Sequence, residues 1–544
     1  MSHLDFGTPD VRTPLERTDR VVVTAEQMAA IESRLFEAGM PVAALMEKVA
    51  GRVTERVTQI LERYSKTAQT KHHVGVLVGP GHNGGDALVV ARELHFKGFP
   101  VSVYRPLGDK AKPLTTQHAQ YLQSLGVPFV DSIEAFQTCD IFVDGLFGFG
   151  QTRPIEGKLA EIVNWINQQP QLKLSIDIPS GLHTDTGEIL GTAIEVDRTL
   201  CLGLWKLGFF QDTALDVLGE VELVEFDIPV ADVVAVLGET PSRQRITRET
   251  AIEALPIPRR RSTHKYKQGH LLLICGSRQY GGAAILAGLG ARASGVGMLS
   301  IAVPETLKPL IHDRLPEALV LGCPETPQGS IDRLPETCHL DAYNAIACGP
   351  GLTQHRDTVV RAILKACCPV VLDADGLNLL AQLDLWQRGN PAESLRFSAE
   401  THRLGKEKAP LILTPHPGEF RRLFPDIEYS HPAIAASVAA RQSRSIVVVK
   451  GARAAIGYPD GSVRLNPDST PALARGGSGD VLTGLMGGLV ATATAEGNPV
   501  APLITSSVWW HARAGILSAN ERTELGVDAF TLARDLNLVL TRSL

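Results

Sequence analysis

The 544-residue sequence lacks several patterns that would indicate a zinc, exported or membrane protein. None of its eight cysteines forms a C-x-x-C pair, and no Cys/His group has zinc-site spacing. The first twenty residues contain no apolar core of a signal peptide, and no uncharged run is long and unbroken enough to cross a bilayer. We therefore expect reduced thiols in a soluble, cytoplasmic protein that does not bind membranes.

The sequence also has no excess of positive charge, since its net charge is -6. This argues against a nucleic-acid protein that works through bulk positive charge, and we read the run Arg259–Arg261 as a solvated linker. Apolar residues make up 44% and charged residues 21%, which is ordinary for a globular protein. The partners we expect are small molecules and further copies of the chain, as a homo-oligomer.

Short apolar runs that end in glycine-rich loops, each followed by a helical stretch, recur along the chain and predict an α/β protein with mainly parallel sheets. The predicted strands are 74–78, 101–104, 141–144, 172–178, 199–202, 221–226, 270–275, 298–303, 318–321, 345–348, 369–372, 410–413 and 445–449. The Pro- and Arg-containing stretch 232–261 predicts a linker between domains at 20–236 and 240–544. Residues 384–407 are polar, without clear period, and predict an inserted loop.

The first predicted strand runs into a loop with four glycines, Gly79–Asp86, before a predicted helix at Ala87–His95. Such a loop lets backbone N–H groups approach a ligand, and a helix N-terminus favours an anion. The loop matches G-x-G-x-x-G, but the second strand ends in Arg105 rather than an acid. A dehydrogenase that uses NADP, or a tight turn with no ligand, therefore remains an alternative.

Two acids end predicted strands, Asp144 and Asp177. An acid in an apolar run is costly to bury unless it has partners. Ligands of open α/β sheets bind at the carboxyl ends of strands, so these acids suggest a bound cation or a catalytic acid/base. Helix capping is the alternative for each acid alone.

Three motifs, His82–Asp86, Asp144–Gly148 and Asp177–Leu182, in this order resemble the NAD(P)H-hydrate epimerase family over about residues 20–233. The resemblance implies a Rossmann-like fold, Asp177 as a catalytic residue, and a potassium ion held by Asn83, Asp144 and Ser180. The substrate residues that it implies are His82, Asn83, Gly84, Gly85, Asp86, Gly148, Phe149, Gly150, Gln151, Thr152, Arg153, Pro154 and Asp177.

The sequence departs from this family at three positions: the family usually has Asn for His82, Gly for Ala87 and Thr for Phe149. Histidine can still donate a hydrogen bond. Lys206 matches a family lysine that could neutralise phosphate, with an ordinary surface lysine as the alternative.

The second half carries Gly476–Asp480 directly before a predicted helix at Val481–Thr494. Glycines before a helix expose N–H donors, and the helix dipole points at any negative charge that arrives. Asp480 could cap the helix, or take a hydroxyl proton while the N–H groups stabilise a transferring phosphoryl group. This arrangement resembles the ribokinase-like fold.

Five other strand-end motifs accompany it: Tyr280–Ala283, Gly349–Leu352, Asp373–Asn378, Thr414–Glu419 and Lys450–Ala452. Together they resemble the NAD(P)H-hydrate dehydratases over about residues 242–541, and His416-Pro-Gly-Glu separates these from generic sugar kinases. The resemblance implies that substrate meets Ala283, Gly351, His416 and the catalytic Asp480, and that nucleotide meets Lys450, Gly451, Ala452, Arg453, Ala454 and Gly479. His416 as a core histidine is the alternative, and Arg475 stands where the family often has Thr.

The two resemblances imply repair of hydrated NADH and NADPH. The first domain would interconvert the R and S hydrates, and the second would phosphorylate the S hydrate and expel phosphate. Hydroxide is a poor leaving group, so a phosphoryl donor is needed; the resemblance favours ADP over ATP, with magnesium. The alternatives are a vitamin- or sugar-type kinase with an appended binding domain, and a first domain that only binds or scaffolds. Asp144 and Asp177 argue against the last.

Overall fold

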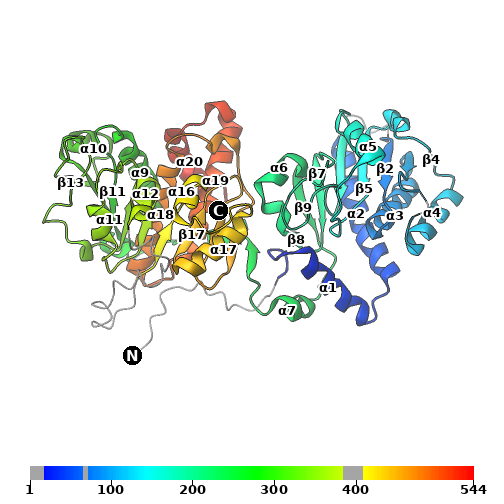
Figure 1. Ribbon diagram of the computed structural model, residues 1–544, viewed down its shortest axis with the longest axis horizontal. Coiled ribbons are helices and arrows are strands. Elements are labelled where there is room, and N and C mark those ends of the chain that lie inside the picture. The colour runs from blue at the N-terminus through cyan, green and yellow to red at the C-terminus, as the bar shows by residue number, and fades with distance from the viewer. Residues whose placement is uncertain (1–16, 65–70, 109, 384–408, 544) are drawn as a thin grey trace. The chain divides into compact units, whose positions relative to one another are not determined.

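The computed structural model describes residues 17–64, 71–108, 110–383 and 409–543. The chain divides into two compact units, Pro14–Pro241 and Ser242–Leu544 (Figure 1). Each unit is built on a sheet in which most neighbouring strands are parallel, with helices packed against it. The expected α/β architecture is therefore confirmed.

The sheet of the first unit has the strand order β4-β3-β2-β5-β6-β7-β9, and all its pairs are parallel. Its strands are β2 (Val74–Val78), β3 (Val101–Tyr104), β4 (Phe129–Val130), β5 (Ile141–Gly145), β6 (Leu172–Ile176), β7 (Arg198–Leu202) and β9 (Glu220–Val224); β1 (Val22–Val23) pairs separately with β8 (Trp205–Lys206). The chain reverses its direction of winding between β2 and β5. In open α/β sheets such a switch point opens a crevice at the strand ends.

The helices of this unit are α1 (Ala25–Glu37), α2 (Val42–Tyr64), α3 (His82–Phe96), α4 (Pro113–Ser124), α5 (Gly157–Asn167), α6 (Leu215–Leu218) and α7 (Val230–Leu237). Alternate residues of β2 face opposite sides, as in any strand. Val76 packs into a core shared with α1, α2 and α3, whereas Leu77 packs into a second core with α5. Both faces of the sheet are thus buried, which explains why its strands are continuous apolar runs.

The second unit has a ten-stranded sheet of order β10-β19-β18-β17-β16-β15-β14-β11-β12-β13. Its strands are β10 (Arg243–Arg245), β11 (His270–Ile274), β12 (Met298–Pro304), β13 (Leu319–Cys323), β14 (Ala345–Cys348), β15 (Val370–Leu372), β16 (Leu411–Leu413), β17 (Ile446–Val449), β18 (Ala455–Gly457) and β19 (Val463–Leu465). Only the pairs that β18 makes with β17 and β19 are antiparallel. The winding switches between β11 and β14, the kind of position at which open α/β sheets bind ligands.

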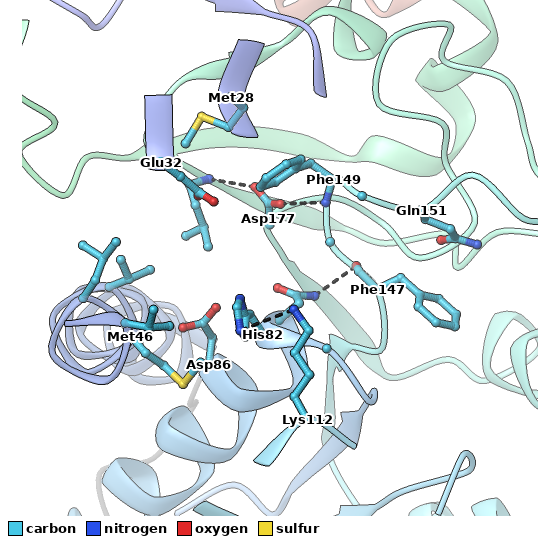
Figure 2. Close-up of a pocket in the computed structure, with 18 of the residues that line it drawn as sticks. Met28, Glu32, Met46, His82, Asp86, Lys112, Phe147, Phe149, Gln151 and Asp177 are labelled. Atoms are coloured by element: carbon cyan, nitrogen blue, oxygen red, sulfur yellow. Dashed lines mark hydrogen bonds between the residues drawn. The ribbon is translucent and has the colours of Figure 1, made fainter. Parts of the chain in front are cut away.

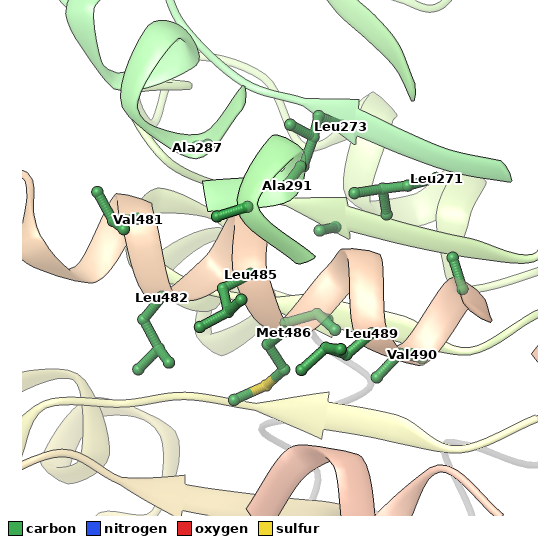
Figure 3. Close-up of a cluster of buried hydrophobic side chains, with 14 of the residues drawn as sticks. Leu271, Leu273, Ala287, Ala291, Val481, Leu482, Leu485, Met486, Leu489 and Val490 are labelled. Carbon is green, nitrogen blue, oxygen red and sulfur yellow. The ribbon is translucent and has the colours of Figure 1, made fainter. Parts of the chain in front are cut away.

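The helices of the second unit are α8 (Arg248–Glu253), α9 (Gly281–Ser294), α10 (Lys308–Arg314), α11 (Thr358–Ile363), α12 (Ala374–Gln382), α16 (Pro417–Leu423), α17 (Pro432–Ser443), α18 (Ser478–Glu496), α19 (Ala501–Arg522) and α20 (Ala529–Ser543). Helix α18 packs on β11 through apolar side chains such as Leu485 and Leu489 (Figure 3). It also packs closely against α9, since a Cβ at Gly484 would overlap the carbonyl oxygen of Ala287. This packing fixes the position of the N-terminus of α18.

The expected linker at 232–261 is wrong in part, because much of it is folded. Strand β10 pairs with β19, and Ala251 of α8 is buried in the core of the second unit. Apolar positions such as Ile246 and Leu255 lie in the same core, whereas Arg259–Arg261 are exposed as expected. The predicted insertion at 384–407 lies outside the described residues.

The cysteines are free, and six of the eight are buried. This agrees with the expected reduced thiols. Within the described residues, no helix has the length and apolar character needed to cross a membrane.

Candidate functional sites

The loop after β2 is shorter than the sequence predicted. Helix α3 begins at His82 rather than Ala87, so Asn83–Asp86 lie in its first turns. The reason is close packing at the end of β2, where a Cβ at Gly84 would overlap the carbonyl oxygen of Gly79. The glycines therefore bring α3 against the strand end and direct His82, Asn83 and Asp86 into the crevice.

A cavity of about 410 Å³ lies at this crevice. Among the predicted substrate residues, its lining includes His82, Asn83, Asp86, Gly148, Phe149, Gly150, Gln151 and Asp177. Gly84 and Gly85 are buried inside α3 and do not line it, and Thr152, Arg153 and Pro154 are exposed outside it. Figure 2 shows the carboxyls of Glu32, Asp86 and Asp177 turned toward the same space.

Asp177 follows β6 and is held by a set of donors. Its Oδ1 lies 2.9 Å from Nζ of Lys206, and its Oδ2 accepts a hydrogen bond of 3.0 Å from the backbone N–H of Phe149. Its backbone has a positive φ of 70°, an unusual conformation for a residue other than glycine and one that often occurs at functional sites. The Phe149 backbone therefore takes part in positioning Asp177, whatever side chain the position carries.

Lys206 is fully buried, so the surface-lysine alternative is wrong. Its Nζ donates to the carbonyl oxygens of Leu202 at 2.6 Å and Leu204 at 3.0 Å, besides its ion pair with Asp177. Burial acts to lower the pKa of Lys206, but the Asp177 carboxylate outweighs it and raises the pKa. The lysine therefore remains charged and compensates the buried carboxylate.

Asp144 ends β5 and is also buried. Its Oδ1 accepts from the Ser180 hydroxyl at 2.7 Å, and its Oδ2 accepts from the Ser180 backbone N–H at 2.8 Å. Burial raises the pKa of Asp144 to about 6, although these hydrogen bonds oppose the shift.

Asn83 donates from Nδ2 to the carbonyl oxygen of Phe147 at 3.0 Å, while its buried Oδ1 has no hydrogen-bond partner.

In the second unit, Asp480 lies in the first turn of α18, whose N-cap is Gly477 with a φ of 91°. Burial, with a contribution from the nearby Asp373 carboxylate, raises the pKa of Asp480 to about 7. Lys450 opposes this shift. An acid that titrates near neutral pH at a helix N-terminus can exchange a proton with a bound hydroxyl.

Three strand ends bring further charged groups beside Asp480. Lys450, after β17, lies 2.5 Å from Oδ1 of Asp373, which follows β15. Thr483 of α18 donates to Oδ2 of Asp373 at 2.7 Å. Burial acts to raise the pKa of Asp373, but Lys450 and this hydrogen bond outweigh it and lower the pKa. A Cβ at Gly479 would lie 3.6 Å from both Lys450 Nζ and Asp373 Oδ2, so Gly479 covers this ion pair.

His416 is the N-cap of α16 and is not a core histidine, because about half of its side chain is exposed. Its ring nitrogen Nδ1 accepts from the Gly418 N–H, and its Nε2 lies 3.3 Å from Glu419 Oε1. Glu419 Oε2 in turn lies 4.0 Å from Lys450 Nζ. Histidine, glutamate and lysine therefore form one chain of contacts that leads to Asp373.

The remaining predicted positions fall into separate groups. Gly351, which follows β14, and Ala283 in α9 are neighbours, since a Cβ at Gly351 would lie 2.9 Å from that of Ala283. Gly451–Ala454 connect β17 to β18. Arg475 donates to the carbonyl oxygens of Leu525 and Val527, so this departure from the family pattern holds the segment before α20.

Sequence reasoning gave no role to four polar groups that the structure places at these sites: Glu32, Lys112, Asp373 and Glu419. Asp373 and Glu419 were noted only as members of the motifs Asp373–Asn378 and Thr414–Glu419. Asp373 follows a strand in the same way as Asp177, so the same rule would have marked it as a candidate site residue. Glu32 follows Met28 by four residues and precedes Phe36 by four, so it stands on the same helix face as two apolar cavity residues. An acid at such a position was a usable signal.

Two α/β units with carboxylates and lysines gathered at their strand ends define this chain as a two-unit enzyme. A family model described as NAD(P)H-hydrate dehydratase matches residues 271–537, and one described as YjeF-related protein N-terminus matches residues 42–208. The chain is 50% identical to the bifunctional NAD(P)H-hydrate repair enzyme Nnr of Synechocystis sp. over 94% of each chain. It is 48% identical to the enzyme of that name from Thermosynechococcus vestitus, over 97% of this chain and 99% of the relative. The chain belongs to the family of bifunctional NAD(P)H-hydrate repair enzymes.

Among solved structures, the chain is similar to an ADP/ATP-dependent NAD(P)H-hydrate dehydratase from Bacillus subtilis, co-crystallised with ATP and Mg²⁺. The identity is 34% and the TM-score is 0.44, over 55% of this chain and 98% of that chain.

Proposed function

We propose that this chain restores hydrated NADH and NADPH in two steps, one in each unit. The first unit interconverts the R and S hydrates, and the second dehydrates the S hydrate with ADP as the favoured phosphoryl donor. The observation that carries the proposal is Asp480, a carboxyl with a pKa near 7 in the first turn of α18, beside Lys450. Family membership supports the same reading.

In the second unit, Asp480 takes the proton from the substrate hydroxyl as that oxygen attacks the transferring phosphoryl group. The N–H groups of the first turn of α18 face the negative charge. Phosphate then leaves in place of hydroxide and the ring double bond is restored. Substrate contacts Ala283, Gly351, His416 and Asp480, and nucleotide contacts Gly479 and Lys450–Ala454.

Magnesium would enter this site together with the nucleotide, because the nearby carboxylates of Asp373 and Glu419 are already paired with Lys450, Thr483 and His416. When bound with the nucleotide, it neutralises charge on the phosphate groups.

The alternative function, a vitamin- or sugar-type kinase, would form a stable phosphorylated product instead of NADH or NADPH.

In the first unit, substrate occupies the cavity between His82–Asp86 and Gly148–Gln151, with Asp177 as an acid/base at the reacting carbon. Thr152, Arg153 and Pro154 contact substrate from the rim. Lys206 holds Asp177 in place through their ion pair.

Potassium would be held by Asn83, Asp144 and Ser180. The unpartnered, buried Oδ1 of Asn83 supports this assignment, and all three side chains offer oxygen, the donor of hard cations. When bound, the ion supplies a positive charge that orders the loops around substrate. We further propose that the two units are independent domains of a homo-oligomer in the cytoplasm.

The test is incubation of the full chain with a mixture of hydrated NADH epimers and either ADP or ATP, following the recovery of NADH absorbance. Complete recovery with nucleotide supports both activities. Recovery that stops when the S hydrate is consumed would exclude the epimerase. No recovery with either nucleotide would exclude the dehydratase.

A further inference from the structure

Glu32 is a carboxyl of the cavity that has no role yet: it is not one of the proposed potassium ligands, and it is not part of the Asp177–Lys206 ion pair. It stands on α1, and its side chain is turned into the cavity from the helix face that also carries Met28 and Phe36 (Figure 2). An acid that serves only solubility would be placed on the outer face, as Glu37 of the same helix is. Glu32 instead lines the cavity, where a bound substrate would shield its carboxyl from solvent.

The charged groups around Glu32 act on it in opposite directions. Burial and the Asp177 carboxylate raise the pKa of Glu32 to about 7, while Lys206 and Lys112 oppose the shift. A further carboxyl, Asp86, lines the same cavity, and burial raises its pKa well above the usual range. At neutral pH, therefore, Glu32 can carry a proton, whereas Asp177 forms an ion pair with buried Lys206.

We propose that Glu32 and Asp177 form the acid–base pair of epimerisation, and that Glu32 donates the proton with which the substrate hydroxyl leaves. This inference rests on the proposed epimerase function of the first unit. Two neighbouring carboxyls in unlike environments are a common way for enzymes to obtain one acid and one base at the same pH. Here the two environments differ because Lys206 forms an ion pair with Asp177, whereas burial is the main influence on Glu32.

The step balances without any co-reactant other than water. The hydroxyl of a hydrated dihydropyridine stands on the ring carbon next to nitrogen. Glu32 gives its proton to that hydroxyl, the C–O bond breaks with both electrons on oxygen, water leaves, and the nitrogen lone pair forms a C=N bond. Water then attacks the other face of the carbon, gives its proton to Asp177, and the C=N electrons return to nitrogen. A proton finally passes from Asp177 to Glu32 through water, which restores the enzyme.

The first test compares Glu32→Gln with Glu37→Gln in the full chain, without nucleotide, so that dehydration does not consume either epimer. Conversion of one epimer to the other is followed by chromatography. We expect epimerisation by Glu32→Gln to fall by about 10²-fold or more, the usual contribution of a general acid, with substrate affinity retained. Glu37→Gln, the same charge change outside the cavity, should match the unmodified chain. Glu32→Asp should recover part of the rate and serves as the variant if glutamine prevents folding.

Two further readouts separate a catalytic from a structural role. The active pair carries one proton, so kcat/KM should fall as pH rises through about 7, and Glu32→Gln should lose this limb. In oxygen-18 water, each epimerised molecule should gain one solvent oxygen, after correction for the reaction without enzyme. Retention of the substrate oxygen, or a normal rate and pH profile in Glu32→Gln, would overturn the assignment of Glu32. Failure of the unmodified chain to epimerise would overturn the proposed function of the unit itself.

Discussion

Nζ of Lys206 lies 2.9 Å from Oδ1 of Asp177, and both side chains are buried. Nζ of Lys48 lies at the same distance from Oδ2 of Asp227, but that pair is exposed. The two ion pairs therefore have the same length but differ in burial, and Asp227 has a second partner in Arg52. The exposed pair serves as the comparison for the buried one.

Lys206→Met should lower the free energy of unfolding of the first unit by about 3–5 kcal/mol, because it leaves the Asp177 charge buried without its partner. Lys48→Met should have little effect, because that pair is exposed and Arg52 still pairs with Asp227. Hydrogen exchange of the β5 and β6 amides with increasing denaturant measures both. Equal effects would show that Asp177 keeps adequate partners in its backbone N–H donors.

Asp480→Asn should reduce dehydration by about 10²–10⁴-fold, since the amide cannot accept the hydroxyl proton. Nucleotide binding, measured by calorimetry, should survive because the N–H groups of α18 are unchanged. Asp426→Asn, an exposed position after α16, is the control. Near-normal turnover by a folded Asp480→Asn protein would remove Asp480 from the mechanism.

The rate of dehydration should increase as the pH rises through about 7, because a base must be deprotonated and the pKa of Asp480 is raised to about 7. Asp373→Asn should move this limb to lower pH, since it removes a carboxylate that raises the pKa of Asp480 and frees Lys450, which lowers it. Steady-state rates from pH 5 to 9 at saturating nucleotide test this. A limb that stays in place would assign the titration to another group.

Asp144→Ala should mainly raise KM for epimerisation by loosening the loops around substrate, whereas Asp177→Ala should mainly lower kcat. Crystals grown in potassium salt and measured for anomalous scattering should show an ion near Asn83, Asp144 and Ser180. An ion bound by Asp177 but not by Asp144 would reverse the two roles. If no ion is found, Asp144 remains an acid that braces Ser180.

Residues 1–241 and 242–544, expressed separately, should each fold, the first epimerising hydrate and the second dehydrating one epimer. The cut after Pro241 keeps α7 whole and leaves β10 with its partner β19. Circular dichroism and the two activity assays measure the result. If neither piece is soluble, the domain assignment is wrong.

The positions of most of the parallel strands followed from the sequence, and β2 and β14 have the predicted bounds. A strand buried on both faces must be apolar throughout, so its ends are visible where the run stops. The same rule could not find β10 or β19, which are short and carry arginine and which are placed by pairing with neighbouring strands. Nor could it show that α3 starts at His82, because glycines favour a loop unless packing overrides that preference.

The sequence by itself determined the α/β class, the strand ends and the motifs that identify the family, because these depend on local patterns. Which residues act on substrate stays a prediction. Only the tertiary structure decided that Lys206 is buried beside Asp177, that Asn83 keeps a buried oxygen without a partner, and that Glu32 faces the same cavity from α1. These groups lie far apart along the chain, so the charge and burial that each experiences arise only when the helices and strands pack together.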